Sequence, residues 1–296
     1  MTDEVQPHAT PALLRAAGAV SRAAHARGLL GERGSGLVRL LSRSVAGRGT
    51  TTYRDPHGHV VDADLSDYLE RAGFFGAHSA PVLRHMVALL RPGDWAIDAG
   101  AAVGLFAGPM AAAVGRTGSV WAVEPLARNV QRLQRLKELN DLVQLEVLPV
   151  ALTSETATAR LRLPAAPGGS AFGSFVATWE RAGETEVPTC RLDDLVMARD
   201  PGRPLRLLKI DVEGSEPELL EGAAATLTGR FKPLVVCEFH DPLLHTAGSS
   251  SQDLLERFAT LGYAPRPPFD RPARRLDGRV CDLLLGPIDL GATAAT

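Results

Sequence analysis

Ionisable side chains cluster at the ends of two apolar segments, "LRLLKID" and "LVVCEFH", in the C-terminal half of the chain. Lys209, Asp211 and Glu213 follow one another at intervals of two residues, and Glu238 and His240 are also two apart. Side chains at i and i+2 of a strand share a face, so neighbouring strands would bring all five into one cleft. Close carboxylates with partial burial have raised pKa values there. Such a cleft is suited to removing a proton from a bound molecule, although a hydrogen-bonded structural imidazole explains His240 by itself almost as well.

A glycine-containing turn follows a third apolar segment, "WAIDAG", which carries Asp98 near its end. Gly100 and Gly104 lie in this turn, just before a predicted helix. Small residues let a ligand approach the backbone, and a helix N-terminus offers unpaired N–H groups. The next predicted strand ends at Glu124, where a carboxylate can accept hydrogen bonds from both hydroxyls of a ribose. Together these features predict a cofactor that contains a nucleoside; the alternative is a tight turn that binds nothing.

The spacing of the glycines distinguishes between two such cofactors. A dinucleotide fingerprint requires Gly-x-Gly-x-x-Gly, whereas this turn reads Gly100-Ala-Ala-Val-Gly104. The spacing therefore favours S-adenosylmethionine over NAD.

The elements that must hold these residues alternate from about residue 80 onward. Apolar strand-like segments are separated by segments with helical periodicity, which predicts an α/β domain over 80–296 with a mostly parallel sheet and helices on both faces. Ligand sites in such sheets lie beyond the carboxyl ends of the strands. Residues 1–50 are expected to form an N-terminal helical extension, and 51–79 a small hairpin and a lead-in segment.

Composition excludes several classes of partner. The formal net charge of -2 gives no basic field for nucleic acid. The three cysteines follow no metal-ligand spacing, and no run of about 18 apolar residues predicts a membrane span. A soluble cytoplasmic protein is expected. The apolar face of the N-terminal helices is the one feature that favours a homodimer contact, and their Arg-rich face is expected to be solvated.

The chain resembles the FkbM-type methyltransferases over roughly residues 60–288. The resemblance is carried by "GDWAIDAGAAVGLFA", "VEP", "VALTSETATARL", "VPTCRLDDLV", "CEFH" and "CDLLLGP", and above all by "LLKIDVEGSEPELLEGA". It implies a Rossmann-like class I methyltransferase fold with a seven-stranded sheet. It also implies an S-adenosylmethionine-dependent O-methyltransferase that acts on a sugar or polyketide-like hydroxyl in natural product biosynthesis.

The resemblance also implies roles for individual residues. Asp98, Gly100 and Ala101 would line the methionine end of the cofactor, Glu124 would bind its ribose, and 151–152 would flank the adenine. The full set of expected cofactor-binding residues is Asp98, Gly100, Ala101, Gly104, Glu124, Pro125, Ala151, Leu152 and Asp211. One position departs from the family, which often has Asn where this chain has Ala102, so a polar contact is missing there or is supplied from elsewhere.

Two versions of the chemistry follow. In the first, His240 is the base that takes the hydroxyl proton, assisted by Asp211 or Glu238, while Lys209 holds the carboxylates in place. In the second, Asp211 and Glu238 bind a divalent cation such as Mg²⁺ that acidifies the hydroxyl.

Three other functions compete with these. A nicotinamide-dependent oxidoreductase fits the alternation but not the glycine spacing. A nucleic-acid methyltransferase would share the cofactor half, but the chain lacks an Asn/Asp-Pro-Pro-aromatic segment for a flipped base. A non-catalytic binding protein that has kept the fold is the third.

Overall fold

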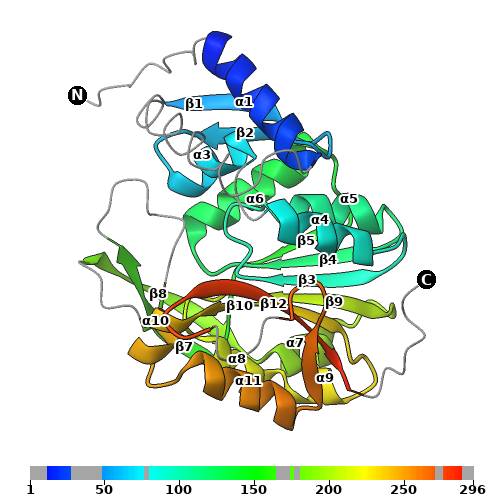
Figure 1. Ribbon diagram of the computed structural model, residues 1–296, viewed down its shortest axis with the longest axis vertical. Coiled ribbons are helices and arrows are strands. Elements are labelled where there is room, and N and C mark those ends of the chain that lie inside the picture. Colours follow the sequence, from blue (N-terminus) through cyan, green and yellow to red (C-terminus); the bar gives the residue numbers. More distant parts are fainter. Residues whose placement is uncertain are drawn as a thin grey trace.

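A small N-terminal unit lies on one side of a large α/β layer in the computed structural model, which describes residues 12–27, 49–76, 80–164, 174–176, 181–270 and 276–288 (Figure 1). The elements of this N-terminal unit are α1 (Ala12–Ala26), β1 (Thr50–Arg54), β2 (Val60–Asp64) and α3 (Tyr68–Phe75). The strands β1 and β2 pair antiparallel around the turn Asp55-Pro56-His57-Gly58 and form the expected small hairpin. The second helix expected before residue 50 lies outside the described residues.

The α/β layer is built on a seven-stranded sheet in the order β11-β12-β10-β9-β3-β4-β5. Its strands are β3 (Trp95–Ala99), β4 (Ser119–Val123), β5 (Leu145–Leu148), β9 (Leu205–Ile210), β10 (Leu234–His240), β11 (Tyr263–Arg266) and β12 (Val280–Pro287). β12 runs antiparallel to both of its neighbours, and the pairs from β10 to β5 are parallel. The seven-stranded, mostly parallel sheet expected for a class I methyltransferase fold is therefore confirmed.

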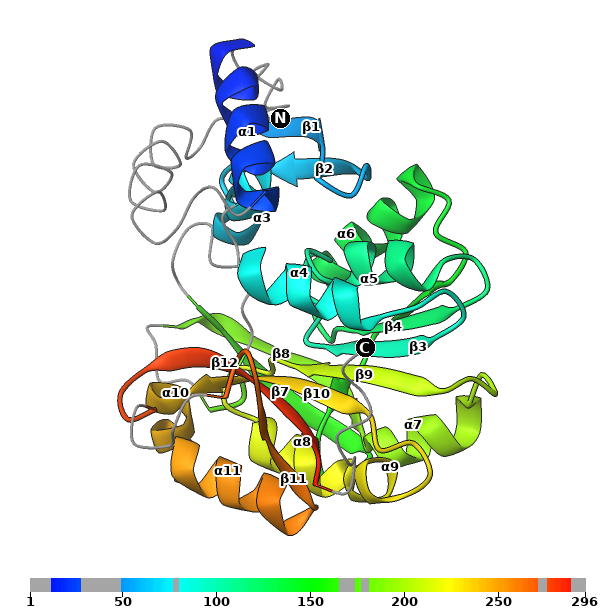
Figure 2. The ribbon, with the colours of Figure 1, turned by 45° about the vertical axis from the view of Figure 1, so that its right-hand side comes forward.

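Helices cover both faces of this sheet, as two views of the ribbon show (Figures 1 and 2). On the face toward the N-terminal unit lie α4 (Ala80–Leu89), α5 (Ala107–Val114) and α6 (Ala127–Leu139). On the other face lie α7 (Leu192–Arg199), α8 (Glu216–Gly222), α9 (Ala224–Thr228) and α11 (Ser251–Thr260). The short helix α10 (Asp241–Thr246) follows β10 directly. A subsidiary sheet has the order β6-β8-β7, with the strands β6 (Ala151–Leu152), β7 (Ala157–Pro164) and β8 (Arg181–Cys190).

Two apolar cores lie on the two faces of the sheet. Trp95 and Ile97 of β3 belong to the core under α7–α9 and α11, while Ala96 belongs to the core under α4–α6. This alternation is the period of two that a strand imposes, and all five β3 residues are buried because both faces are covered. It also places Asp98 on the α4–α6 face, fully buried, one residue before the strand ends.

Candidate functional site

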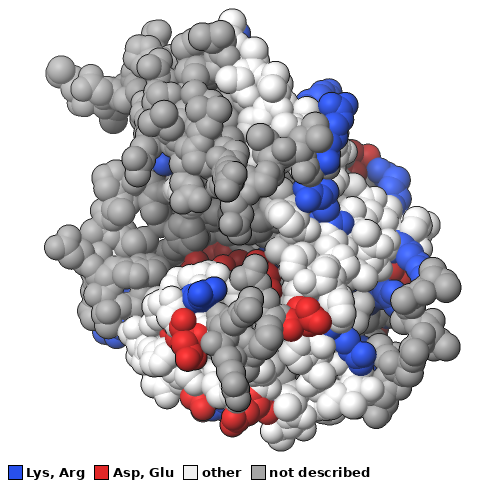
Figure 3. Space-filling view, viewed as in Figure 1, with Lys and Arg blue, Asp and Glu red and all other residues white. Residues whose placement is uncertain are grey.

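A cavity opens beyond the carboxyl ends of β3, β4, β9 and β10. It encloses about 940 Å³ when its open mouth is included. Nine of the predicted site residues line it: Gly100, Ala101, Glu124, Pro125, Ala151, Leu152, Lys209, Asp211 and Glu238. Asp98, Gly104 and His240 are outside that lining. The space-filling view shows acidic side chains gathered in a recess on one side of the molecule (Figure 3).

Gly100 lets the turn after β3 pack closely against the end of β9. Gly100 has φ +81, and a Cβ on it would lie 1.8 Å from the carbonyl oxygen of Asp211 at the end of β9. Only glycine fits both conditions, because it tolerates a positive φ and has no Cβ. Gly104 has a packing role instead, since a Cβ there would lie 2.8 Å from Cδ2 of Leu136 on α6.

Glu124 fastens this turn to the start of α6. Its side chain is 5% exposed. Oε2 accepts a hydrogen bond of 2.9 Å from the Ala102 N–H, and Oε1 accepts one of 2.8 Å from the Leu126 N–H. Burial raises the pKa of Glu124 to about 7. The Asn129 side chain also hydrogen-bonds this carboxylate, and because a carboxylate has about four lone-pair sites, Glu124 retains the capacity to accept from a ligand in the cavity.

A buried ion-pair chain lies beside the glycine turn. Asp98 and Lys209 are partners across the parallel strands β3 and β9. Nζ of Lys209 lies 3.4 Å from Oδ1 of Asp98 and 3.1 Å from Oδ2 of Asp211, and 4.7 Å from the centre of the Phe106 ring. Burial disfavours the ammonium, but the Asp211 and Asp98 carboxylates outweigh it and raise the pKa of Lys209. The lysine is therefore a fixed positive charge that orients Asp211 at the cavity wall.

Three more carboxyl groups lie next to this chain. Burial, and after it the charge of Asp211, raises the pKa of Glu238 well above its usual value and that of Glu213 to about 8. Asp282 on β12 is the cross-strand partner of Glu238, and burial raises its pKa to about 6. A carboxylate with a raised pKa is a stronger proton acceptor, which suits a general base. Asp282 was not predicted; its only signal was one acid in the apolar segment "CDLLLGP".

His240 is placed differently from the prediction. It is the last residue of β10, and α10 begins at the next position. Its Nδ1 accepts a hydrogen bond of 3.3 Å from the Leu243 N–H and so caps α10. The predicted cleft therefore contains Lys209, Asp211, Glu213 and Glu238 without His240.

The expected divalent cation is not supported by the ligand geometry. In the ranges that the structure describes, no group of three or more His, Cys, Asp or Glu side chains is arranged to hold a metal ion. The Lys209 ammonium lies between Asp98 and Asp211, at the position where a cation between carboxylates would bind.

In the part of the chain that the structure describes, every helix is too short or too polar to cross a lipid bilayer.

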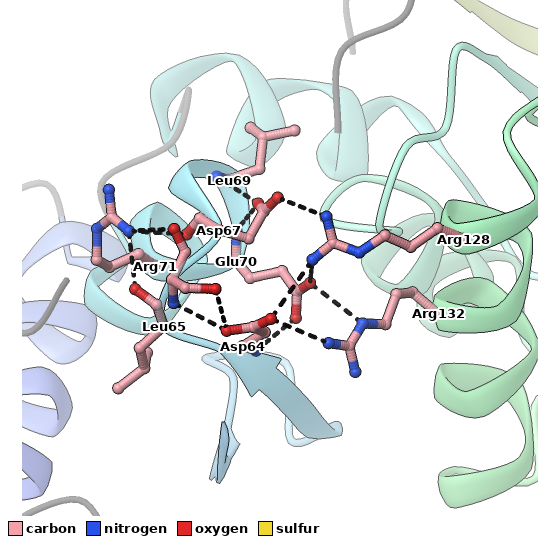
Figure 4. Close-up of polar contacts among 9 residues, drawn as sticks. Asp64, Leu65, Asp67, Leu69, Glu70, Arg71, Arg128 and Arg132 are labelled. Carbon is pink, nitrogen blue, oxygen red and sulfur yellow. Dashed lines mark hydrogen bonds and ion pairs between the residues drawn. The ribbon is translucent and has the colours of Figure 1, made fainter. Parts of the chain in front are cut away.

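The N-terminal unit contributes to the cavity through α3. Leu69 of α3 lines it. Arg128 of α6 lies 3.3 Å from Asp67 and 3.6 Å from Glu70, and Arg132 lies 3.1 Å from Glu70 (Figure 4). We call these four charged residues the α3–α6 clamp. Asp67 and Glu70 are 1% and 4% exposed, so the clamp is buried on its acidic side. Sequence reasoning missed it because its partners are about 60 residues apart.

Comparison with known proteins gives one family. A family model described as the methyltransferase FkbM domain matches residues 98–265, which is more than half of the chain. No curated protein matches the sequence.

Solved structures with a similar arrangement are methyltransferases of low sequence identity. The methyltransferase FkbM from Methylobacillus flagellatus KT is 17% identical, with a TM-score of 0.39 over 74% of this chain and 55% of that one. This chain thus spans little more than half of that protein's length. M. jannaschii TYW2, solved with AdoMet, is 12% identical, with a TM-score of 0.45 over 81% and 87% of the two chains. A SAM-dependent O-methyltransferase from Thermotoga maritima is 13% identical, with a TM-score of 0.42 over 80% and 77%.

Proposed function

Because the chain belongs to the FkbM methyltransferase family, and is therefore an S-adenosylmethionine-dependent methyltransferase, we propose that it methylates a hydroxyl group of a small sugar-like or polyketide-like molecule. The observation that carries this proposal is the cavity itself. Glu124 lies in one part of its wall, and a set of buried carboxyl groups around Lys209 lies in another. The first part is suited to a nucleoside, and the second to a weakly acidic hydroxyl.

The residues present fit the cofactor. Glu124 would accept hydrogen bonds from the ribose hydroxyls, and the bare Gly100 backbone would leave room for the methionine end beside Ala101. Ala151 and Leu152 would flank the adenine as apolar walls. When bound, S-adenosylmethionine supplies an activated methyl group, so the protein's part is to align the acceptor and take its proton.

Glu238 is the base that the geometry favours. It lines the cavity, and in its ionised form a carboxylate with a raised pKa accepts a proton more strongly than an ordinary carboxylate. In the proposed step Glu238 would take the proton of the acceptor hydroxyl as the oxygen receives the methyl group that the cofactor would supply. The products are the methyl ether and S-adenosylhomocysteine. Lys209 would keep Asp211 ionised and oriented beside the reacting oxygen.

A panel of hydroxyl compounds tests this proposal. The purified protein is incubated with S-adenosylmethionine and each compound, and S-adenosylhomocysteine and methylated product are quantified. Glu238→Gln is expected to lower turnover at least 100-fold, as loss of general base catalysis does, with cofactor binding retained. His240→Gln is the matched control and should keep most of the activity. Retained activity in Glu238→Gln together with a large loss in His240→Gln would instead identify His240 as the base.

Two further experiments test the metal-assisted mechanism and a nucleic-acid acceptor. Turnover that survives a chelator supports a carboxylate acting alone, whereas loss of turnover that Mg²⁺ restores would support the metal-assisted version with Asp211 and Glu238. Turnover that survives nuclease treatment supports a small-molecule acceptor. The cavity's carboxylates argue in the same direction, since they would repel a phosphate backbone.

A further inference from the structure

A second cavity lies between the N-terminal unit and helices α4 and α5. It encloses about 1,030 Å³ including its opening. Its apolar lining includes Val61, Leu83, Leu105, Phe106, Pro109 and Leu136. The family model begins at residue 98, so part of this wall comes from elements that precede the matched region.

The second cavity adjoins the first. Val103, Leu105 and Phe106, which follow the glycine turn, line both of them. Phe106 is also in contact with the Lys209 ammonium, with its ring centre 4.7 Å from Nζ. The segment 103–106 therefore has the buried charges of the first cavity on one side and the mostly apolar second cavity on the other.

The N-terminal wall of the second cavity is fixed to the rest of the protein at several points. The α3–α6 clamp holds α3, and Asn140 at the end of α6 accepts from the Val60 N–H at 2.6 Å and donates to the Val60 carbonyl at 2.8 Å. Arg84 of α4 donates to the carbonyl of His25 on α1. The space is therefore bounded by elements that are bonded together.

We propose that the second cavity binds the apolar body of the methyl acceptor, and that the acceptor extends past the 103–106 segment, which lines both cavities, so that its reacting hydroxyl reaches Glu238 in the first cavity. This inference rests on the proposed function and narrows it. Burial of an apolar chain or ring system in this space would contribute binding free energy in proportion to its area. The acceptor class is then an alcohol that carries a long acyl chain or an apolar ring system, and a free sugar, which has no apolar body, is a poor ligand.

The binding test uses a fluorescent apolar probe, N-phenyl-1-naphthylamine, and its displacement by straight-chain primary alcohols from hexan-1-ol to decan-1-ol. In the unaltered protein, affinity should rise about fourfold per methylene, which corresponds to about 0.8 kcal/mol per buried CH₂. Leu83→Trp and Ala80→Phe, which fill the cavity from α4, should each weaken the longer alcohols at least tenfold. Ala88→Trp on the exposed side of α4 is the matched control and should change nothing. Thermal unfolding of each variant verifies that it is folded.

Three results would overturn the inference. The first is the absence of displacement by any alcohol, and the second is equal displacement from the cavity-filled variants and the control. The third is an unchanged KM of Leu83→Trp for every apolar acceptor that the enzyme methylates, since the inference predicts a raised KM with kcat retained. Titration of the same proteins with S-adenosylmethionine keeps the two proposals apart. If the cofactor fails to bind, the proposed function fails, whatever the alcohols do.

Discussion

Replacement of Gly100 by alanine tests how the cofactor cavity is built. The Gly100 backbone has φ +81 and faces the carbonyl of Asp211, so the added Cβ would lie 1.8 Å from that oxygen. Gly115 provides a matched control, because it also has a positive φ, +63, but no atom lies within 4 Å of its added Cβ. Both substitutions place an alanine at a positive φ, and only Gly100→Ala also brings the Cβ against a neighbouring atom.

The expected magnitudes follow from these two features. Gly115 has φ +63 and ψ 179, a sparsely populated backbone conformation that costs other residues on the order of 1–3 kcal/mol, so Gly115→Ala should lower the free energy of unfolding by that amount. In Gly100→Ala the end of β9 must also move away, which breaks the 3.1 Å hydrogen bond from the Asp211 N–H to the Ala99 carbonyl. Loss of a buried hydrogen bond adds roughly 1–3 kcal/mol. With a backbone cost of the same order at Gly100, the total for Gly100→Ala is about 2–6 kcal/mol.

Urea unfolding of both variants measures these differences, and calorimetric titration with S-adenosylmethionine measures their effect on the cavity. Gly100→Ala should weaken the cofactor at least tenfold because it displaces Asp211 in the cavity wall, and Gly115→Ala should leave the affinity unchanged. Equal losses of stability in the two variants, together with equal cofactor affinity, would refute the contact between the glycine turn and β9.

Two further predictions concern charged groups. Arg132→Ala leaves the buried carboxylate of Glu70 with Arg128 alone, and should lower the free energy of unfolding by roughly 3 kcal/mol, as broken buried pairs do. Arg116→Ala, which breaks an exposed pair with Asp141, should lower it by no more than about 1 kcal/mol; equal losses in urea unfolding would contradict a structural role for the clamp. The pKa of Glu124, raised to about 7 by burial, means that the folded protein binds a proton more tightly than the unfolded chain. The contribution of Glu124 to the free energy of unfolding should therefore fall as pH rises from about 4.5 to 7. In unfolding series across this window, the free energy of unfolding of Glu124→Gln should fall by about 3 kcal/mol less than that of the unaltered protein. Parallel profiles of the two proteins would show that Glu124 does not titrate there.

The elements and residues that the sequence predicted correctly depend on neighbours along the chain. The alternation that predicted β3, β4, β9 and β10 is a local period, and the turn that contains Gly100 follows its strand within two residues. Local patterns can still be overridden, as the region around Ser215 shows. Ser215 followed by Glu218 three residues later is the sequence pattern of a capping box. The Ser215 side chain nevertheless makes no capping bond, and the buried Glu216 accepts from the Val212 and Gly214 N–H groups instead.

The residues that sequence reasoning missed are placed by contacts between distant segments. Asp282 reaches the acidic cluster only because β12 inserts antiparallel between β10 and β11. Leu69 reaches the cofactor cavity only because α3 is held against α6. His240 was predicted in the cleft because strand alternation places it on the same face as Glu238, but the start of α10 engages its ring as a cap. A period of two gives the face on which a side chain lies, but it does not give the point at which the next element begins.

The central claim is that the cavity beyond β3, β4 and β9 binds S-adenosylmethionine through Glu124. Isothermal titration with S-adenosylmethionine, S-adenosylhomocysteine and NAD, on the unaltered protein and on Glu124→Ala, tests it most directly. We expect micromolar binding of both sulfur nucleosides, no binding of NAD, and an affinity of Glu124→Ala for the sulfur nucleosides that is at least tenfold lower. Unchanged affinity in Glu124→Ala, or no binding of either sulfur nucleoside to the unaltered protein, would contradict it.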